Sequence, residues 1–323
     1  MKGYSMTGII CGTGSAIPVA IVDNHDLAKL VETNDEWIRE RTGIVRRHIA
    51  DTETTVSLAA EAAKKALADA KMDAAEIDLL LVSTISSNVI LPCTACEVQK
   101  EIGAENAFCF DMNAACTGFV LAYQTACAYL ASGICRTALV IGSECLSNLI
   151  NWQDRSTCIL FGDGAGAVVV KAGEGSFYLP VSHSDGIKGD ALTCFSRHDG
   201  KYKNSSACFM QMDGQAVFKF AVRSVPEVIG EVLEKNNLQK KEIDWFVLHQ
   251  ANRRIVEAVA KRMEESIEKF PMNLQEYGNT SSASIPILLD EMNHRGVLKG
   301  GQKIVLVGFG AGLTWGASIL EWK

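Results

Sequence analysis

The sequence has few residues that break regular structure and no segment of biased composition. Only 6 of its 323 residues are proline, and no low-complexity run interrupts it, which argues against a disordered linker or tail. No apolar stretch is long enough to span a membrane, and residues 1–18 are too short and too broken by glycine for a secretory signal. We therefore expect a cytoplasmic globular protein with one large domain or two smaller ones.

Basic residues are fewer than acidic residues. The chain has 31 lysines and arginines against 38 acidic residues, a formal net charge of −7. A surface with that balance does not attract nucleic acid or an anionic membrane, so we expect neither as a partner. An acidic protein partner would need a local basic patch.

The 11 cysteines are not typical of a disulfide-rich secreted domain, because their number is odd and most lie in apolar segments. A reducing compartment fits this usage better. Cys93 and Cys96 have the spacing of a redox or zinc motif, but no second pair or histidine cluster accompanies them. We therefore expect no metal and no redox cofactor.

What the sequence does contain is an approximate internal duplication. The hydrophobic pattern predicts a helix over residues 57–67, and the buried strand after it opens with Glu76-Ile-Asp78. The second half repeats this order, with a helix over 224–233 and a strand that opens with Glu242-Ile-Asp244. Each half then continues with another helix, a strand, a glycine-rich turn and a last strand, over 118–132, 137–142, 162–166 and 167–171, and over 283–295, 303–308, 308–312 and 317–322.

Alternating helices and strands of this kind build a layered α/β fold. We interpret the chain as two duplicated α/β halves related by a pseudo-twofold, residues 1–174 and 175–323. Helix–strand echoes occur in any α/β protein, but the shared Glu-Ile-Asp at matching places favours duplication. Residues 183–213 break the pattern and are typical of an insertion or a long loop, the kind of segment that often forms a lid or a tunnel wall.

Cys116 is the cysteine with the most informative surroundings. An apolar strand over 107–111 runs into a turn of small residues, and an apolar helix follows. Cys116 is therefore expected at or next to a helix N-terminus, where free amide donors and the helix dipole favour the nucleophilic thiolate. The alternative is a buried structural cysteine, and this context alone does not decide between them.

Two polar residues of the second half occupy comparable positions. His249 ends an apolar strand, where open α/β sheets place ligand sites, although a histidine there can also be a cap or a core residue. Asn279 lies in a polar turn that opens another helix and is equally placed to be an N-cap or turn residue. By the duplication, this turn corresponds to the one that bears Cys116, so the two should face each other.

Taken in order, these segments resemble the β-ketoacyl-acyl-carrier-protein synthase III family of thiolase-like condensing enzymes, over essentially the whole chain. The resemblance implies the thiolase-like αβαβα fold. A Cys–His–Asn set also differs from the Cys–His–His set of elongating ketosynthases and from thiolases, which use a second cysteine. The motifs that carry the resemblance are Asn113-Ala-Ala-Cys116-Thr-Gly-Phe, His249-Gln-Ala-Asn252, Tyr277-Gly-Asn279-Thr-Ser-Ser-Ala-Ser, Arg155 with Phe161-Gly-Asp-Gly-Ala-Gly, and Gly308-Phe-Gly-Ala-Gly-Leu-Thr-Trp-Gly.

The resemblance implies the decarboxylative Claisen condensation that starts fatty acid synthesis. Cys116 would take the acyl group from acyl-CoA, with the backbone amides of Cys116 and Ala311 as oxyanion donors. Family members often have glycine where this chain has Ala311. The alanine affects the shape of the loop but keeps the backbone amide that donates. His249 and Asn279 would stabilise the enolate formed when malonyl-acyl-carrier protein loses carbon dioxide. The family needs no cofactor, since acyl-CoA is a substrate.

The resemblance also assigns binding residues. Thr33 to Glu36 has the pattern of a capping box, but Trp37 and Arg41, one turn apart, can hold a flat ring between them. The family places the CoA adenine there. Leu91 stands where the family often has a phenylalanine at the end of the acyl pocket, which suggests a different primer. The positions that match CoA and pantetheine contacts are Thr33, Trp37, Arg41, Arg155, Gly214, Phe218, Asn252 and Ile255.

Local basic clusters stand out in this acidic chain. They are usually a solvated face, but a carrier protein rich in carboxylates needs such a patch. Lys219 and Arg254 match the carrier-docking positions of the family. Family members are homodimers, so we expect a homodimer here, with the apolar strand over 107–110 near the interface. The full set of basic residues is Lys219, Arg223, Arg253, Arg254, Lys261 and Arg262.

Other functions were weighed against this one. A dinucleotide-binding oxidoreductase needs a helix after its glycine motif, whereas residues 167–170 after the glycines at 162–166 are typical of a strand, which excludes it. A Cys–His–Asn acyl-thioester hydrolase would release free acid without a malonyl donor. Within the family, the alternative is a starter ketosynthase or acyltransferase of secondary metabolism. The intact Cys116, His249 and Asn279 argue against a non-catalytic binding subunit.

Overall fold

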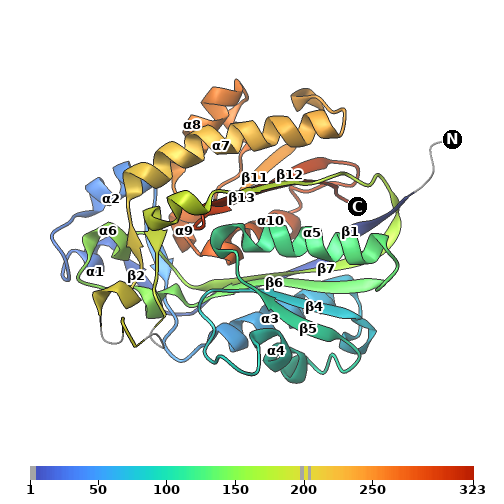
Figure 1. Cartoon of the computed structure of the whole chain (residues 1–323), viewed down its shortest axis with the longest axis horizontal. Coiled ribbons are helices and arrows are strands. Elements are labelled where there is room, and N and C mark those ends of the chain that lie inside the picture. Colours follow the sequence, from blue (N-terminus) through green and yellow to red (C-terminus); the bar gives the residue numbers. More distant parts are fainter. Residues whose placement is uncertain (1–4, 197–199, 203–204) are drawn as a thin grey trace.

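The computed structural model describes residues 5–196, 200–202 and 205–323, and its helices and sheets stack in five layers (Figure 1). Helices α3 (Thr55–Ala70) and α4 (Thr94–Ile102) cover the outer face of a five-stranded sheet. Helices α5 (Gly118–Ala131) and α10 (Ser284–His294) lie between this sheet and a four-stranded one. Helices α7 (Gly214–Lys235) and α8 (Arg253–Met263) cover the far side. This is the predicted αβαβα arrangement.

The two sheets share one topology. In each, the pairs at one edge of the sheet are parallel and the remaining pairs are antiparallel. The five-stranded sheet has the order β1 (Ser5–Ala16), β7 (Gly164–Gly175), β6 (Thr137–Glu144), β4 (Leu79–Ser83) and β5 (Phe108–Met112). The four-stranded sheet has the order β11 (Trp245–Leu248), β12 (Lys303–Gly310), β13 (Thr314–Glu321) and β8 (Val181–Ser184).

Short elements complete the chain around these layers. Two small antiparallel pairs join β2 (Ile21–Asp23) to β3 (Arg46–His48) and β9 (Leu192–Thr193) to β10 (Gln211–Met212). The short helices are α1 (Asn24–Leu27), α2 (Asp35–Thr42), α6 (Arg155–Cys158) and α9 (Leu274–Tyr277).

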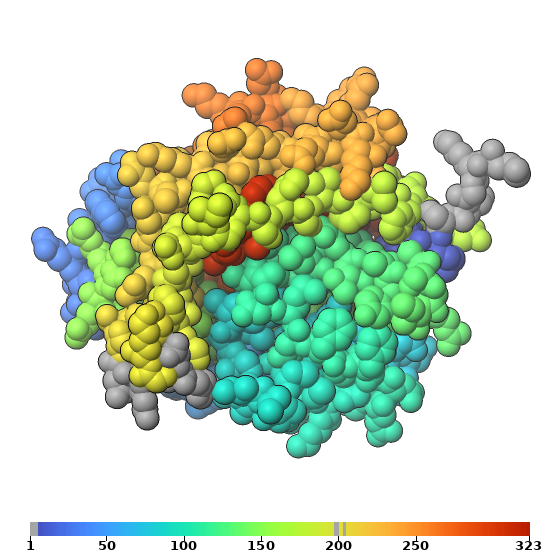
Figure 2. Space-filling view, viewed as in Figure 1, coloured from blue at the N-terminus to red at the C-terminus, as the bar shows by residue number. Residues whose placement is uncertain are grey.

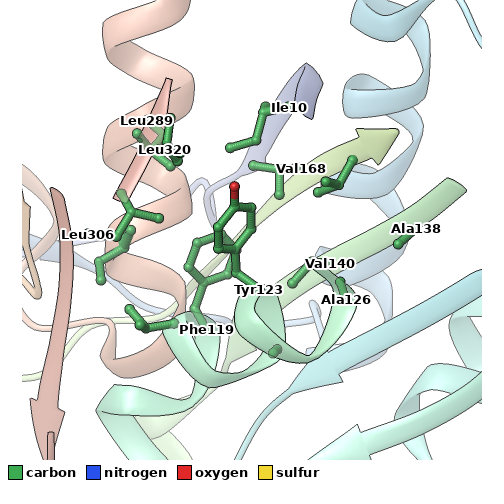
Figure 3. Close-up of a cluster of buried hydrophobic side chains, with 14 of the residues drawn as sticks. Ile10, Phe119, Tyr123, Ala126, Ala138, Val140, Val168, Leu289, Leu306 and Leu320 are labelled. Carbon is green, nitrogen blue, oxygen red and sulfur yellow. The ribbon is translucent and has the colours of Figure 1, made fainter. Parts of the chain in front are cut away.

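The central layer joins the two halves through apolar side chains. Successive residues of a strand point to opposite faces of its sheet, so Leu79 and Leu81 face α5 while Leu80 faces α3. Phe119 and Tyr123 of α5 lie among side chains from both sheets in Figure 3, including those of Val140, Val168, Leu306 and Leu320. Burying a side chain as large as Phe119 contributes roughly 2–3 kcal/mol, which ties the halves together.

The repeated Glu-Ile-Asp has a structural cause. Glu76 and Glu242 each close a capping box on a 3₁₀ turn just before a strand. Asp78 accepts hydrogen bonds from the backbone at the start of β6, and Asp244 accepts one from Lys303 N at the start of β12. Each aspartate therefore sets the register between two parallel strands of its own half.

Two matching turns meet at the centre of the molecule. Turn η2 (Ala115–Thr117) precedes α5, and turn η8 (Ser281–Ala283) precedes α10. Each packs on a glycine in the central strand of the other half. A Cβ at Gly308 would lie 2.8 Å from Thr117 Cα, and one at Gly142 would lie 2.3 Å from Ser282 O. A side chain at either glycine would push the halves apart.

Some expectations differ from the structure. Helix α7 begins at Gly214 and not near residue 224, because Asp213 caps it by accepting from Gln215 N and Ala216 N. Residues 183–213 are not wholly an insertion, since β8 forms an edge of the second sheet. The described remainder of the segment runs across the side of the molecule that faces the viewer in Figure 2, in yellow-green to yellow. Residues 197–199 and 203–204 lie outside the described part. The division at residue 174 stays a prediction; β7 ends at Gly175 and β8 begins at Val181.

Two further observations concern the cysteines and the helices. The described residues include all 11 cysteines, and no disulfide joins any of them. Within the same part of the chain, no helix combines the length and apolar character that crossing a membrane requires.

Candidate active site

One cavity brings together the three residues expected to carry chemistry. It has a volume of about 110 Å³, and Cys116, His249 and Asn279 all line it. Gly310 closes one side so tightly that a Cβ there would lie 2.8 Å from Cys116 Cβ and 3.2 Å from its Sγ. The three side chains therefore share one chamber with walls from both halves.

Cys116 sits in turn η2, directly before α5 begins at Gly118. The preceding residue, Ala115, has a φ of 45°, a left-handed conformation that is strained for a residue with a side chain. This sharp turn from strand to helix holds the thiol at the cavity wall. The predicted placement beside a helix start agrees with the structure.

The helix start and burial act on the ionisation of Cys116 in opposite directions. Burial raises the pKa of Cys116 to about 12, while the nearby Ser281 hydroxyl lowers it by less. A helix N-terminus stabilises an anion by roughly 0.3–1 kcal/mol, which is under one pKa unit. Removal of water therefore outweighs the helix, and the thiol keeps its proton.

His249 is neutral and firmly held. It follows β11, its backbone N donates to Val307 O at 2.8 Å, and its Nδ1 lies 2.8 Å from Ser284 Oγ. Burial lowers the pKa of His249 to about 3, because a charged imidazolium cannot be solvated here. With Nδ1 engaged by Ser284, Nε2 is the nitrogen left to act on a ligand in the cavity.

Asn279 is held at both its backbone and its side chain. Its N donates to Leu160 O at 2.8 Å, and its own carbonyl accepts from Gly162 N at 3.0 Å. The side-chain Oδ1 accepts from Ser281 N at 2.9 Å, so Nδ2 is the end that can donate to a ligand. The cavity thus combines a protonated thiol with two neutral polar groups.

The cavity extends along α7 and α8. Gly214 and Phe218 line it from α7, and Asn252 and Ile255 line it from the start of α8, as the sequence predicted for a pantetheine arm. Leu192 and Met212 line it as well. These two belong to residues 183–213, so part of that segment forms a cavity wall.

Asn252 connects the cavity to the outer elements. Its Nδ2 donates to Arg41 O at 3.1 Å, and its Oδ1 accepts from Arg254 N at 2.8 Å to cap α8. Arg254 in turn lies over the ring of Phe218, with 5.7 Å from Cζ to the ring centroid. One side chain therefore links the end of α2 to the start of α8.

Trp37 is flanked by two guanidinium groups. The Cζ atoms of Arg155 and Arg41 lie 5.0 and 6.0 Å from its ring centroid. The predicted capping box at Thr33 is wrong, because Asn34 is the N-cap of α2 and accepts from Trp37 N at 2.8 Å. Thr33 Oγ1 is instead buried, with no hydrogen-bond partner in the described part of the chain.

Several expected residues do not line this cavity, among them Thr33, Trp37, Arg41, Arg155, Leu91 and Ala311. Leu91 is 84% exposed on the loop between β4 and α4, so a single chain does not bring it to Cys116. Ala311 directly follows Gly310, and its carbonyl accepts from Thr314 Oγ1 at 3.0 Å.

Cys93 and Cys96 do not line the cavity, and their Sγ atoms lie 3.4 Å apart. Among the described residues, no group of three or more His, Cys, Asp or Glu side chains is arranged to hold a metal ion.

The basic residues divide into two sets. Arg223 and Arg262 both lie within 4 Å of Glu227, and Arg253 pairs with Glu257. Lys219, Arg254 and Lys261 are exposed and, within residues 5–196, 200–202 and 205–323, form no ion pair. Within the predicted basic set, these three carry the uncompensated positive charge.

Sequence reasoning missed Ser281 and Ser284, which contact the site from η8 and α10. The signal was present in the duplication, because these residues align with the turn and helix start around Cys116. It also missed Leu192 and Met212, whose position depends on the β9–β10 pair.

The fold and the site define a thiolase-like condensing enzyme. The structure of 3-oxoacyl-[acyl-carrier-protein] synthase III from Aquifex aeolicus is 42% identical with a TM-score of 0.92, covering 98% of this chain and 100% of that one. A priming β-ketosynthase from a polyketide biosynthetic pathway is 35% identical with a TM-score of 0.94, covering 99% and 97%.

Sequence comparisons narrow this class to one family. The family models for 3-oxoacyl-[acyl-carrier-protein] synthase III and for its C-terminal part match residues 110–186 and 233–322. β-Ketoacyl-[acyl-carrier-protein] synthase III of Clostridium acetobutylicum is 48% identical over 318 residues, which are 97% of this chain and 98% of that protein. The chain belongs to the β-ketoacyl-acyl-carrier-protein synthase III family.

The high pKa of Cys116 has a measurable consequence. Only the thiolate is alkylated, so the iodoacetamide labelling rate of Cys116 should rise about tenfold per pH unit between about pH 7 and pH 10, without a plateau. Peptide mass spectrometry of labelled protein measures this rate, and Cys116→Ala identifies the peptide. A plateau near neutral pH would show that the resting thiol is already ionised.

Proposed function

We propose that this chain joins an acyl-CoA primer to malonyl-acyl-carrier protein by decarboxylative Claisen condensation, with loss of carbon dioxide. The observation that carries the proposal is the meeting of Cys116, His249 and Asn279 in one buried cavity. Residues 1–174 would supply the nucleophile, and residues 175–323 would supply the two polar partners. A cytoplasmic location is part of the proposal.

The first half-reaction transfers the acyl group to sulfur. As the sulfur of Cys116 attacks the thioester carbonyl of acyl-CoA, its thiol proton is released for transfer to the leaving CoA. The backbone amides of Cys116 and Ala311 donate to the oxyanion. Collapse expels CoA as a thiolate, which takes up the proton, and the acyl group remains on Cys116.

The second half-reaction forms the carbon–carbon bond. His249 Nε2 and Asn279 Nδ2 donate to the malonyl thioester carbonyl, so the electron pair released with carbon dioxide is held as an enolate. Neutral donors suit this task, because they stabilise the charge as it develops without a resting charge to solvate. The enolate carbon attacks the acyl thioester, and Cys116 leaves as a thiolate that takes one proton from water.

The outer part of the cavity fits a CoA thioester. Phe218, Asn252 and Ile255 would line the pantetheine arm, starting from Gly214. Trp37 between Arg41 and Arg155 would take the adenine, since guanidinium groups and an indole both stack on a flat ring. Thr33, whose hydroxyl is buried in this structure, would lie beside the nucleotide by its match to the family's CoA contacts.

Substitution of the three central residues tests the function. Cys116→Ala should abolish self-acylation by acyl-CoA, whereas His249→Ala and Asn279→Ala should lower malonyl decarboxylation about 100-fold or more while some acylation remains. Intact-protein mass spectrometry over a panel of acyl-CoAs measures acylation and the preferred acyl group, and released carbon dioxide measures the other step. Free acid released at full rate without malonyl donor would instead indicate a hydrolase.

A starter ketosynthase of secondary metabolism remains the second candidate. The observation that favours it is the close fit to the priming β-ketosynthase structure. Leu91 in place of a phenylalanine also suggests a primer other than acetyl. The same acyl-CoA panel distinguishes the two candidate functions, because a strict preference for acetyl-CoA would contradict the different primer that Leu91 suggests.

We also propose that two copies form a homodimer through β5. This strand lies at the edge of its sheet, where unpaired backbone groups favour pairing with another strand. Phe108 on β5 is 43% exposed, and Val89, Ile90 and Leu91 are exposed on the preceding loop. A second copy over this surface would cover these side chains and could bring Leu91 to the border of a cavity.

The dimer can be tested by one charge at the edge. Phe108→Glu places two carboxylates near the proposed twofold axis, so analytical ultracentrifugation should show a shift from dimer to monomer. The matched control is Ile267→Glu, at a residue 42% exposed in the turn at 267–269, which contacts α8. An unchanged dimer in the Phe108 variant would place the interface elsewhere.

We further propose that the acidic carrier protein docks on the uncompensated charges of α7 and α8. Arg254 lies over the ring of Phe218, which lines the cavity, and Lys219 is the next residue along α7. Long-range attraction at such a patch mainly speeds encounter. A carrier bound there could extend its pantetheine arm along the cavity to Cys116.

Lys219→Ala should raise the KM for malonyl-carrier protein roughly threefold to tenfold, with kcat and the KM for acyl-CoA little changed. The matched control is Arg223→Ala, one turn further along α7, where Glu227 already compensates the charge. Steady-state kinetics with both substrates measures the effect. An equal KM change in both variants would contradict docking at Lys219.

A further inference from the structure

The pseudo-twofold relates the residues around Cys116 to a second set around Ser282. In this second set, the carboxyl side chain of Glu144 stands where the first set has Gly310. Matching positions lie the same number of residues apart along the two halves and at the same register of the sheets. A side chain at Gly310 would collide with Cys116, whereas Glu144 extends its side chain towards Ser282. The residues at matching positions are Cys116 and Ser282, His249 and Ser83, and Gly310 and Glu144.

Glu144 is fully buried and all its oxygen contacts are with neutral groups. Its Oε2 accepts from Ser86 Oγ at 2.7 Å, Ile85 N at 3.1 Å and Thr84 Oγ1 at 3.2 Å. Its Oε1 lies 2.9 Å from Ser282 Oγ. The carboxyl group therefore joins the loop after β4 to turn η8 in the other half.

Counting protons around Ser282 indicates the protonation state of Glu144. Ser282 Oγ lies 2.9 Å from Glu144 Oε1 and 2.9 Å from the carbonyl of Ser83. A hydroxyl has one hydrogen and a carbonyl can only accept, so an ionised Glu144 would leave one contact without a proton. A protonated Glu144 donates to Ser282, which donates to Ser83 O, and both contacts are satisfied.

The surroundings of Glu144 favour the same state. Burial raises its pKa, against the lowering effect of the hydrogen bonds that it accepts. The titratable groups around it are the thiols of Cys116 and Cys145, whose pKa values burial raises to about 12, with Asp163 beyond Cys145. No lysine, arginine or histidine in the described ranges forms an ion pair with Glu144.

We propose that Glu144 is a positioning residue that stays protonated in the native fold and, through Ser282, holds the turn that carries the malonyl-binding groups. Beside Ser282 on this turn, Ser281 N donates to Asn279 Oδ1. Ser284, just after the turn, contacts His249 Nδ1. The role assigned to Asn279 and His249 rests on the proposed function, whereas the protonation of Glu144 does not.

The first test uses Glu144→Gln, in which the amide keeps one donor and one acceptor. An unfolded glutamate ionises near about pH 4.3, and a higher pKa in the fold means that the folded protein binds the extra proton above that pH. Wild type therefore loses stability as pH rises from about 4.3 through the folded pKa, and the glutamine variant does not. The melting temperature of Glu144→Gln relative to wild type should rise with pH across this window.

The same variant gives a direct spectroscopic readout. The infrared difference spectrum of wild type minus Glu144→Gln at neutral pH should contain the carbonyl stretch of a protonated carboxylic acid. A carboxylate band, or a melting-temperature difference that falls as pH rises, would overturn the protonated state. Neither readout depends on a substrate.

The second test compares Glu144→Ala with Glu144→Gln in the two half-reactions. Loss of the bond to Ser282 should lower malonyl decarboxylation about tenfold relative to Cys116 acylation in the alanine variant, while the glutamine variant stays within about threefold of wild type. An unchanged ratio of the two rates in Glu144→Ala would overturn the positioning role. If that variant does not fold, a glutamine variant with a tenfold lower ratio overturns it as well. If the wild-type protein does not decarboxylate the malonyl thioester but its melting temperature depends on pH as expected, the proposed function is refuted. The protonated state of Glu144 is then still supported.

Discussion

The close approach of two turns at the centre of the molecule is the constraint on which the rest depends. Gly142 and Gly308 let η2 and η8 touch the central strand of the opposite half, and a larger residue at either position would separate them. That contact places Cys116 from one half beside His249 and Asn279 from the other. Apolar burial around Phe119 and Tyr123 then stabilises the joined halves (Figure 3).

Much of the fold was predictable from local patterns. The Glu-Ile-Asp repeat marks positions where a capping box and a strand register are both set by backbone hydrogen bonds close in sequence. Small residues before an apolar helix likewise predict the turn at Cys116. The start of α7 was predicted wrongly, because Asp213 caps the helix well before its apolar stripe becomes regular.

The site was less predictable wherever its properties depend on burial. The sequence places Cys116 at a helix start, but it does not show that the cavity removes water from the thiol and raises its pKa. Thr33 fits a capping pattern as well as Asn34 does, and only the backbone geometry selects Asn34. Glu144 gave no motif at all, since its importance comes from a proton shared with a serine of the other half.

The linkage through Asn252 has a consequence for the order of events. Its amide spans from the end of α2 to the cap of α8, so the nucleotide end of one thioester and the carrier face of the other meet at the same side chain. Both substrates then share a single entrance. In the proposed function, free CoA would have to leave past Asn252 before the malonyl-carrier arm enters, so the two thioesters would bind one after the other.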